Sequence, residues 1–211
     1  ACVALLADDK LRAEFTVSDR DEIQLGAGHA GSRIENGRIA RPCDPLRPFD
    51  QSSNFVQGTW RRTLEEMGEL AVRFVHSEDW ASDRHFAFCP PYRLDLDYGG
   101  RAQRDDLEMQ HTVSFGSDLR LVWGLGHRYD SVRAPYWFFG NKRFARDVLR
   151  SFANLEWRPT HRWAVNLGGG WDRDSLAGTN VSPRVSVSYH LDGMQTLRLG
   201  MARSFRTASL F

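Results

Sequence analysis

Apolar and polar residues alternate along most of this chain. Residues 182–191 and 196–203 place apolar side chains at every second position, with arginine, serine and histidine between them. The same period of two runs through 11–18, 107–115, 119–129 and 162–172. Successive side chains of a β-strand point to opposite faces, so this period predicts strands rather than helices. The chain is therefore predicted to be all-β.

The connections between these segments alternate in length. Short turns are predicted at 19–22, 64–69, 116–118, 159–161 and 191–195, and longer polar stretches at about 32–52, 79–103, 131–145 and 173–182. Alternating short and long connections are typical of an up-and-down barrel whose two rims differ. The spacing gives about ten strands of roughly eight to twelve residues, a length that suits a tilted membrane-crossing strand.

Aromatic residues cluster near the ends of the predicted strands. Phe115, Trp157 and Trp163 lie beside short turns, and Tyr129 and Trp171 lie beside long stretches. Amphipathic rings in these places are typical of membrane interfaces. We therefore expect the apolar faces to meet lipid and the polar faces to line a wet or plugged lumen. The predicted fold is an antiparallel up-and-down transmembrane β-barrel, of which this chain supplies a part of about ten strands.

Residues 63–74 form the one segment that also fits a helix. Thr63 and Glu66 match a capping box, and the apolar residues that follow lie near helical spacing. Gly68 falls inside that pattern and weakens a helix, whereas EEMGE fits a turn between two strands. We favour the hairpin.

Composition narrows the class of protein. The 211 residues carry a formal net charge of +1, which argues against capture of nucleic acid by a basic face. Three cysteines are too few for a disulfide framework. Cys43 and Cys89 both lie in proline-containing segments, so either one bridge between them in an oxidising compartment or a pair of free thiols fits the sequence.

No segment carries a catalytic or metal-binding motif. GAGHAG at 26–31 matches a dinucleotide-binding pattern, but Gly37 and Pro42 break the helix that this site requires, so strand glycines facing a lumen explain it better. The histidines are scattered without metal-ligand spacing; His85, in a predicted loop, is interpreted as a polar loop residue rather than a ligand contact. We predict no enzyme activity, no cofactor and no metal site.

Four segments resemble the barrel of a TonB-dependent outer-membrane receptor. They are LRLGMARSFRTASLF (197–211), RDDLEMQHTVSFGSDLRLVWGLGHRYD (104–130), SFANLEWRPTHRWAVNLGGGWD (151–172) and TWRRTLEEMGELAVRF (59–74). Each is similar to a strand or hairpin phrase of that family, and together they extend over most of residues 10–211. Ala208 stands where the family phrase has proline. No counterpart of the family's plug domain is found, so residues 1–211 are expected to be an internal barrel segment without a plug.

The resemblance implies a function in transport. We expect part of a receptor in the outer membrane of a Gram-negative bacterium, contacting outer-membrane lipid and importing a scarce ligand such as a ferric siderophore, haem or cobalamin. A TonB-type energy-coupling protein would act through a plug domain that this chain lacks. A soluble all-β binding module and a passive porin-like barrel are the alternatives.

The stretch APYWFFGNKRFAR at 134–146 is the most suggestive candidate for ligand binding. Aromatic and basic side chains in one loop can stack on and pair with an anionic aromatic ligand, such as a ferric catecholate siderophore. The favoured alternative is an upper aromatic girdle that meets lipopolysaccharide phosphates. The candidate ligand-binding residues are Tyr136, Trp137, Phe138, Phe139, Lys142 and Arg143.

Overall fold

The computed structural model describes residues 5–138, 140 and 142–205. Within these residues the chain is all-β, apart from one 3-10 turn, η1 (Glu65–Met67). The strands are β1 (Leu5–Thr16), β2 (Asp21–Asn36), β3 (Arg47–Leu64), β4 (Gly68–Ser82), β5 (Arg84–Cys89), β6 (Tyr92–Asp97), β7 (Gly100–Phe115), β8 (Leu119–Arg133), β9 (Arg143–Thr160), β10 (Trp163–Asp174), β11 (Gly178–His190) and β12 (Thr196–Ala202).

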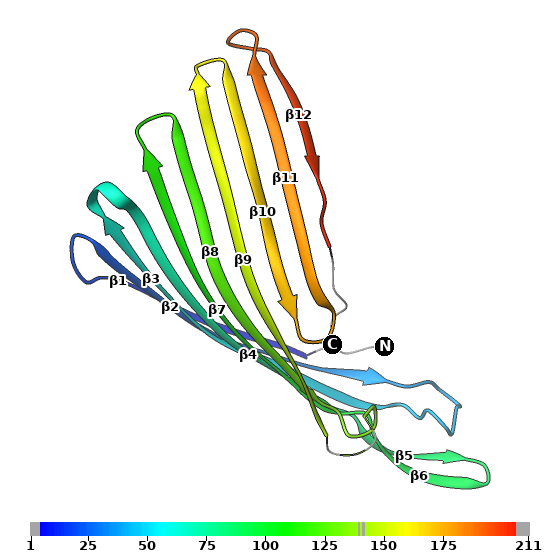
Figure 1. Ribbon diagram of the computed structural model, residues 1–211. Coiled ribbons are helices and arrows are strands. Elements are labelled where there is room, and N and C mark those ends of the chain that lie inside the picture. Colours follow the sequence, from blue (N-terminus) through cyan, green and yellow to red (C-terminus); the bar gives the residue numbers. More distant parts are fainter. Residues whose placement is uncertain (1–4, 139, 141, 206–211) are drawn as a thin grey trace.

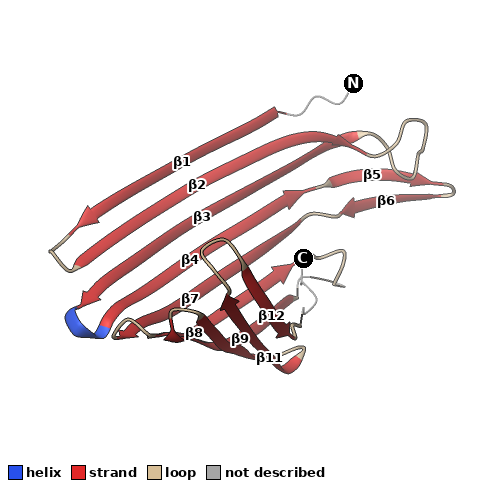
Figure 2. Cartoon of the chain, turned by 90° about the horizontal axis from the view of Figure 1, so that it is seen from above, coloured by secondary structure: helices blue, strands red, loops and turns tan. Residues whose placement is uncertain are grey.

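Ten of these strands form a single antiparallel meander in the order β1-β2-β3-β4-β7-β8-β9-β10-β11-β12. The remaining two, β5 and β6, pair with each other and form a hairpin that projects beyond the sheet (Figure 1). Seen from above, β8 to β12 stand at an angle to β1 to β7, so the sheet is a curved wall (Figure 2). This arrangement confirms the predicted fold class: part of an up-and-down barrel, open in this structure.

The strand register sorts side chains onto two faces. One row across six strands is apolar: Val113, Leu121, Leu155, Leu167, Val185 and Met201. The next row projects from the other face and is mostly small or polar: Thr112, Val122, Asn154, Gly168, Arg184 and Ala202. We call the first the outward face and the second the inward face.

The sheet is a single layer with little conventional core. The largest fully buried side chain among the described residues is Asp130, which lies on the inward face. On the outward face, by contrast, Leu199 is 80% exposed and Met201 is 75% exposed. Such a broad apolar surface is costly in water and favourable against acyl chains.

The predicted aromatic positions all lie on the outward face. Phe115 and Trp157 share a row with Leu119 near the short turns, and the rings of Trp163 and Tyr189 lie 4.6 Å apart at the same end. His111 also faces outward. Its two ring nitrogens bond the Met67 carbonyl oxygen at 2.8 Å and the Trp123 indole N–H at 3.1 Å, so this polar group does not face lipid unsatisfied.

The strands are longer than predicted and the long connections are shorter. The main-sheet strands β2 to β4 and β7 to β9 contain 15 to 18 residues. Loops therefore shrink to 37–46 and 134–142, and the predicted stretch 173–182 reduces to a turn at 175–177. The prediction failed because polarity at a strand end was taken for a loop, although ladder hydrogen bonds form equally well between polar residues outside lipid.

Residues 63–74 form the hairpin rather than the helix. β3 ends at Leu64 and β4 begins at Gly68, with η1 as the turn. Gly68 has φ 86°, and a Cβ there would lie 2.0 Å from the Thr112 carbonyl oxygen. Glycine is therefore required at this position.

The GAGHAG segment lies within β2, as the interpretation as strand glycines predicted. Gly26 and Gly28 face inward and pair with Gln57 and Phe55 of β3. A Cβ on Gly28 would come within 2.3 Å of the Phe55 ring, which shows that the ring covers the glycine. These glycines make room for neighbouring side chains rather than for a dinucleotide.

Candidate functional site

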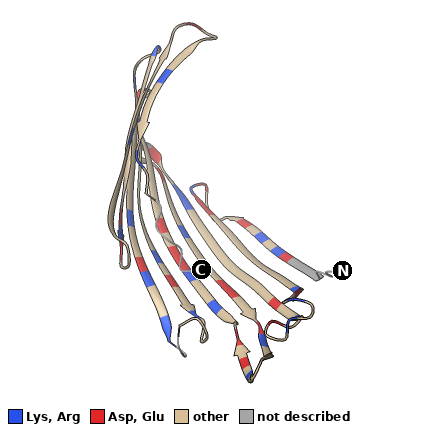
Figure 3. Cartoon of the chain, turned by 90° about the vertical axis from the view of Figure 1, so that its right-hand side faces the viewer, with Lys and Arg blue, Asp and Glu red and all other residues tan. Residues whose placement is uncertain are grey.

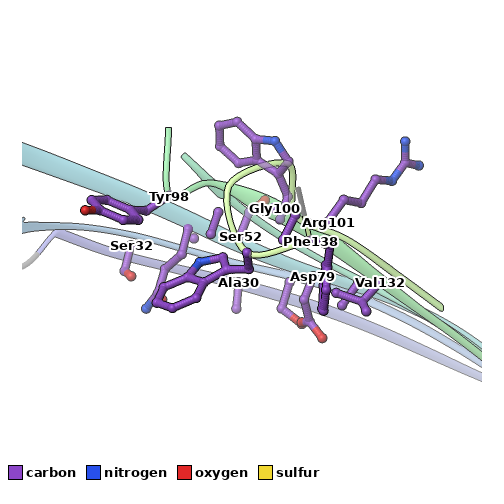
Figure 4. A pocket seen from close by; sticks show the side chains of 17 residues that line it. Ala30, Ser32, Ser52, Asp79, Tyr98, Gly100, Arg101, Val132 and Phe138 are labelled. Carbon is purple, nitrogen blue, oxygen red and sulfur yellow. The ribbon is translucent and has the colours of Figure 1, made fainter. Parts of the chain in front are cut away.

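A cavity of about 1020 Å³ lies on the inward face, at the end of the sheet where the long loops are. Strands β2, β3, β4, β7 and β8 form its wall, and residues of the loop that follows β8 cover it. Its lining includes Ser32, Ser53, Asp79, Tyr98, Trp137 and Phe138. Ser32 and Asp79 point to one side of the sheet and Arg101 to the other (Figure 4).

The loop 134–142 is folded so that its aromatic residues reach this cavity. The backbone N–H groups of Trp137 and Phe138 both donate to the Ala134 carbonyl oxygen at 3.1 Å. Gly140, with φ 108°, donates to the Pro135 carbonyl oxygen at 2.9 Å and closes the turn. The Phe138 ring lies 4.4 Å from that of Phe144, an inward-facing residue of β9. The loop is thus anchored to the inner wall.

An aromatic cluster borders the cavity. The Tyr98 ring meets the edge of Tyr136 at 4.3 Å and lies 5.9 Å from the Trp137 ring. The two tyrosine hydroxyl oxygens are 3.5 Å apart, and this hydrogen bond, together with burial, raises the pKa of Tyr98. The Tyr98 hydroxyl therefore stays neutral at physiological pH, able to donate to or accept from a ligand.

A buried ion pair fixes the loops beside the cavity. Asp83, 3% exposed, accepts from the Arg47 guanidinium at 2.9 Å and from the Asn36 amide at 3.4 Å. The hydrogen bond from Arg47 lowers the pKa of Asp83 despite its burial. Arg47 also donates to Asp44 at 2.8 Å. The start of β3, the 37–46 loop and the end of β4 are thereby held together.

A disulfide ties the 37–46 loop to the β5–β6 hairpin. Cys43 and Cys89 are bonded, with their Cα atoms 4.6 Å apart. The Phe88 N–H donates to the Pro42 carbonyl oxygen at 2.8 Å beside the bridge. The sequence left the pairing of these two cysteines open; their segments meet because β2–β3 and β4–β7 are neighbouring connections on one rim.

His85 is not the exposed loop residue that the sequence suggested. It lies in β5, is 8% exposed, and its Nδ1 is 3.5 Å from Asp83 Oδ1. Its ring is 5.6 Å from that of Tyr98. The segment 84–97 was predicted as loop because it is polar, yet it pairs as the β5–β6 hairpin.

The structure divides the six candidate residues. Trp137 and Phe138 line the cavity and Tyr136 packs against Tyr98, whereas Lys142 is exposed in the loop. Arg143 lies on the outward face of β9, where it donates to Gln103 and Ser131. Phe139 lies outside the described residues. Sequence reasoning missed Tyr98 and Asp79, because only the pairing of β4 with β7 brings them to this rim.

Below the cavity, the inward face carries a network of ion pairs. Arg104 bonds the buried Asp130 at 2.7 Å, and Arg128 lies 3.3 Å from its other oxygen. Arg150 donates to Asp106 at 2.9 Å. Figure 3 shows charged residues of both signs distributed along the strands. This wall is polar, but its positive and negative charges largely neutralise one another.

The side chains around the cavity are of kinds that bind small molecules. Among the described residues, no group of three or more His, Cys, Asp or Glu side chains lies close enough together to hold a metal ion. No helix in that part of the chain is both long enough and apolar enough to span a membrane. The cavity offers aromatic surfaces, hydroxyls, the Gln51 amide, the Asp79 carboxylate and the Arg101 guanidinium.

A curved antiparallel meander with an apolar outward face, a polar inward face and a cavity near one rim defines a section of a transmembrane β-barrel. Residues 11–211 match the family model described as TonB dependent receptor-like, beta-barrel, and the chain belongs to this family. Its members are outer-membrane transport receptors of Gram-negative bacteria, which places this chain in that membrane.

Individual relatives agree with this assignment. The iron-regulated outer membrane virulence protein of Vibrio cholerae serotype O1 is 21% identical over 220 residues, which cover 93% of this chain and 33% of that protein. A mutant of the ferric enterobactin receptor PfeA from Pseudomonas aeruginosa superposes with a TM-score of 0.83 at 13% identity, covering 98% of this chain and 34% of the receptor. The siderophore receptor PirA from Acinetobacter baumannii superposes with a TM-score of 0.79 at 12% identity, covering 97% of this chain and 34% of the receptor. The chain spans about a third of the length of these relatives.

Proposed function

We propose that this chain is part of an outer-membrane receptor for energy-coupled uptake of a ferric siderophore. The observation that carries the proposal is the inward cavity at the long-loop end, in a chain of the TonB-dependent receptor barrel family. The relatives are described as iron-regulated, as a ferric enterobactin receptor and as a siderophore receptor. These descriptions favour an iron chelate over haem or cobalamin.

The chemistry of the cavity fits a chelate of this kind. Its volume of about 1020 Å³ lies at the upper end of the range for small-molecule sites. Tyr98, Trp137 and Phe138 provide flat apolar surfaces for the rings or methylene arms of a chelator. Ser32 and Ser53 provide hydroxyls that orient its polar groups.

Uptake requires an energy source and a closed wall. A TonB-type protein is proposed to act through a plug domain seated against the inward face, whose ion pairs Arg104–Asp130 and Arg150–Asp106 present polar groups to such a domain. In the sheet of the described residues, β1 and β12 each have a single neighbour. Unpaired strand edges are not tolerated in lipid, so further strands of the receptor are proposed to complete the barrel.

The test uses the native receptor in outer membranes, with a panel of ferric catecholate and ferric hydroxamate siderophores, haem and cobalamin. Trp137→Ala should weaken binding of the transported chelate about tenfold, the cost of losing roughly 1.4 kcal/mol of ring contact. Tyr92→Ala is the matched control, because Tyr92 is 68% exposed on the β5–β6 hairpin, away from the cavity. Equal affinities of both variants for every ligand would overturn the proposal.

Energy coupling needs a separate measurement. Uptake of radioactive iron as the chelate should stop when an uncoupler dissipates the proton-motive force, while binding at the surface should persist. A passive porin-like barrel would continue to transport under these conditions. Uptake that is insensitive to the uncoupler would therefore refute energy-coupled transport even if the cavity binds the chelate.

A further inference from the structure

The cavity lining contains a carboxylate without a partner. Asp79 of β4 and Arg101 of β7 are the charged residues of the described lining. Arg101 forms an ion pair with Glu78, and it points to the side of the sheet opposite to Asp79 (Figure 4). The Asp79 side chain, by contrast, is exposed and forms no hydrogen bond or ion pair within the described residues. Negative charge is therefore left uncompensated at Asp79.

The strand register places this carboxylate among small neighbours. Asp79 pairs with Ser53 of β3 on one side and with Ala102 of β7 on the other, and directly paired residues project from the same face. Neither neighbour carries a charge, and neither is large enough to cover a carboxylate. Arg104 lies on the same face two residues further along β7, but it donates to the buried Asp130 at 2.7 Å. Asp79 is thus open to whatever occupies the cavity.

The basic residues expected beside the ligand lie elsewhere. Lys142 and Arg143 were candidates for pairing with an anionic chelate, but neither is among the described residues that line the cavity. Arg143 donates instead to Gln103 and Ser131 on the outward face. A polyanionic ligand in this cavity would therefore meet a carboxylate without a matching cation, and like charges at close range in a partly desolvated site repel each other.

The aromatic rings of the cavity also favour a cation. Tyr98 and Trp137 line it with their ring centres 5.9 Å apart, and Tyr136 packs against Tyr98 at 4.3 Å. The face of an aromatic ring carries negative charge density, so it attracts a cation placed over it. An ammonium group has three N–H donors, so it can donate to a carboxylate while it contacts a ring face. The carboxylate and the rings together match a protonated amine.

We propose that the ferric chelate carries a protonated amine and that Asp79 binds this amine. The inference rests on the proposed function and refines it, because it specifies the charge of the transported chelate. Specificity is a difference between two affinities. The amine-bearing chelate gains a charge-assisted hydrogen bond, whereas a polyanionic catecholate chelate is repelled by the same carboxylate. Asp79 is thus a specificity-determining residue.

The experiment measures the binding of matched pairs of ferric hydroxamate chelates to the native receptor in outer membranes. Each chelate is used with a free amine and with that amine acetylated, which removes the positive charge and keeps the iron centre. The free-amine form should bind the wild type about tenfold more tightly, and Asp79→Asn should abolish this difference. Glu35→Gln is the control, because it removes the same charge from an exposed residue that is not among those lining the cavity. It should keep the full preference.

Further readouts separate this inference from misfolding and from the proposed function. The acetylated chelate should bind Asp79→Asn as tightly as the wild type, which shows that the variant is folded, and a ferric catecholate should bind the variant more tightly than the wild type. Equal binding of the two forms by the wild type, an undiminished preference in Asp79→Asn, or an equal loss of both forms in that variant would overturn the inference and leave ferric siderophore binding standing. Failure of every ferric chelate to bind would instead refute the proposed function, and the inference with it.

Discussion

Gly124 in β8 provides a sharp test of how the inner wall is packed. It faces inward and pairs with Phe152 of β9. A Cβ at this position would lie 2.5 Å from the Phe152 ring and 2.6 Å from the Met109 carbonyl oxygen. The ring can rotate, but the carbonyl belongs to the β7 backbone and can move only with the ladder. Gly124→Ala should therefore strain both neighbouring strands.

The matched control lies two residues further along the same strand and face. A Cβ on Gly126 would meet nothing closer than 3.5 Å, an ordinary contact. Alanine is intrinsically better than glycine in a strand by about 0.5–1 kcal/mol, so Gly126→Ala should be neutral or slightly stabilising. Overpacking costs about 1–3 kcal/mol. Gly124→Ala should therefore lose about 1–2 kcal/mol of unfolding free energy after the alanine gain is subtracted.

The assay is reversible urea unfolding of the receptor in lipid vesicles, followed by tryptophan fluorescence. In a double-mutant cycle, Gly124→Ala should cost less unfolding free energy in a Phe152→Ala background than in the wild type, because the contact with the ring is gone. Part of the cost should remain, because the contact with the Met109 carbonyl oxygen is still present. Stability of Gly124→Ala equal to or greater than that of Gly126→Ala would refute the close approach of these strands, and with it the packing of the inner wall.

Three further predictions test the assignment of residues to the two sheet faces and the stability of the rim at the long loops. Leu121→Arg places charge on the outward face, one row inside the aromatic girdle, and should cost about 1–2 kcal/mol in lipid. Val122→Arg, which faces inward, should cost less, and equal losses of unfolding free energy would contradict the assignment of faces. Arg47→Ala leaves Asp83 buried without its main partner and should destabilise the rim by about 3–5 kcal/mol, seen as faster hydrogen exchange in β5 and β6. Because Arg47 lowers the pKa of Asp83, the contribution of this pair to stability is complete above about pH 4. The wild-type protection factors, which are corrected for the intrinsic exchange rate at each pH, should fall only as the pH drops below that value. Cys89→Ser removes a bridge that closes 46 residues and should open the hairpin to proteolysis; unchanged cleavage would show that the hydrogen bonds alone hold it.

Strand positions and faces could be predicted from the sequence because they depend on local order. The alternation around Leu121 and Val187 assigns each residue to a face before any partner is known. The turn at Gly68 could also be predicted, since glycine there interrupts the helical pattern. The ends of the strands could not be predicted from the sequence, because polar residues beyond the membrane form the same ladder of hydrogen bonds as apolar residues within it.

The candidate site was only partly predictable. Trp137 and Phe138 were candidate ligand-binding residues because they are neighbours in a run of aromatic residues, and both line the cavity. Arg143 belongs to the same run, but the strand begins at that residue and directs it outward. Tyr98 and Asp79 carry no local signal, since their place beside the cavity depends on pairing between segments separated by the β5–β6 hairpin.

The extension of the strands beyond the lipid-facing surface explains how the two faces of one rim can differ in their surroundings. Within the membrane, alternation separates acyl chains from the lumen; above it, the same alternation continues with water on both sides. Val132 therefore lines the cavity while its neighbour Arg133 projects from the opposite face. Because adjacent residues face opposite ways, Val132→Trp should fill the cavity and weaken ligand binding, whereas Arg133→Gln should leave ligand binding intact. An equal loss of ligand binding in both variants would mean that the two faces of the rim are not independent.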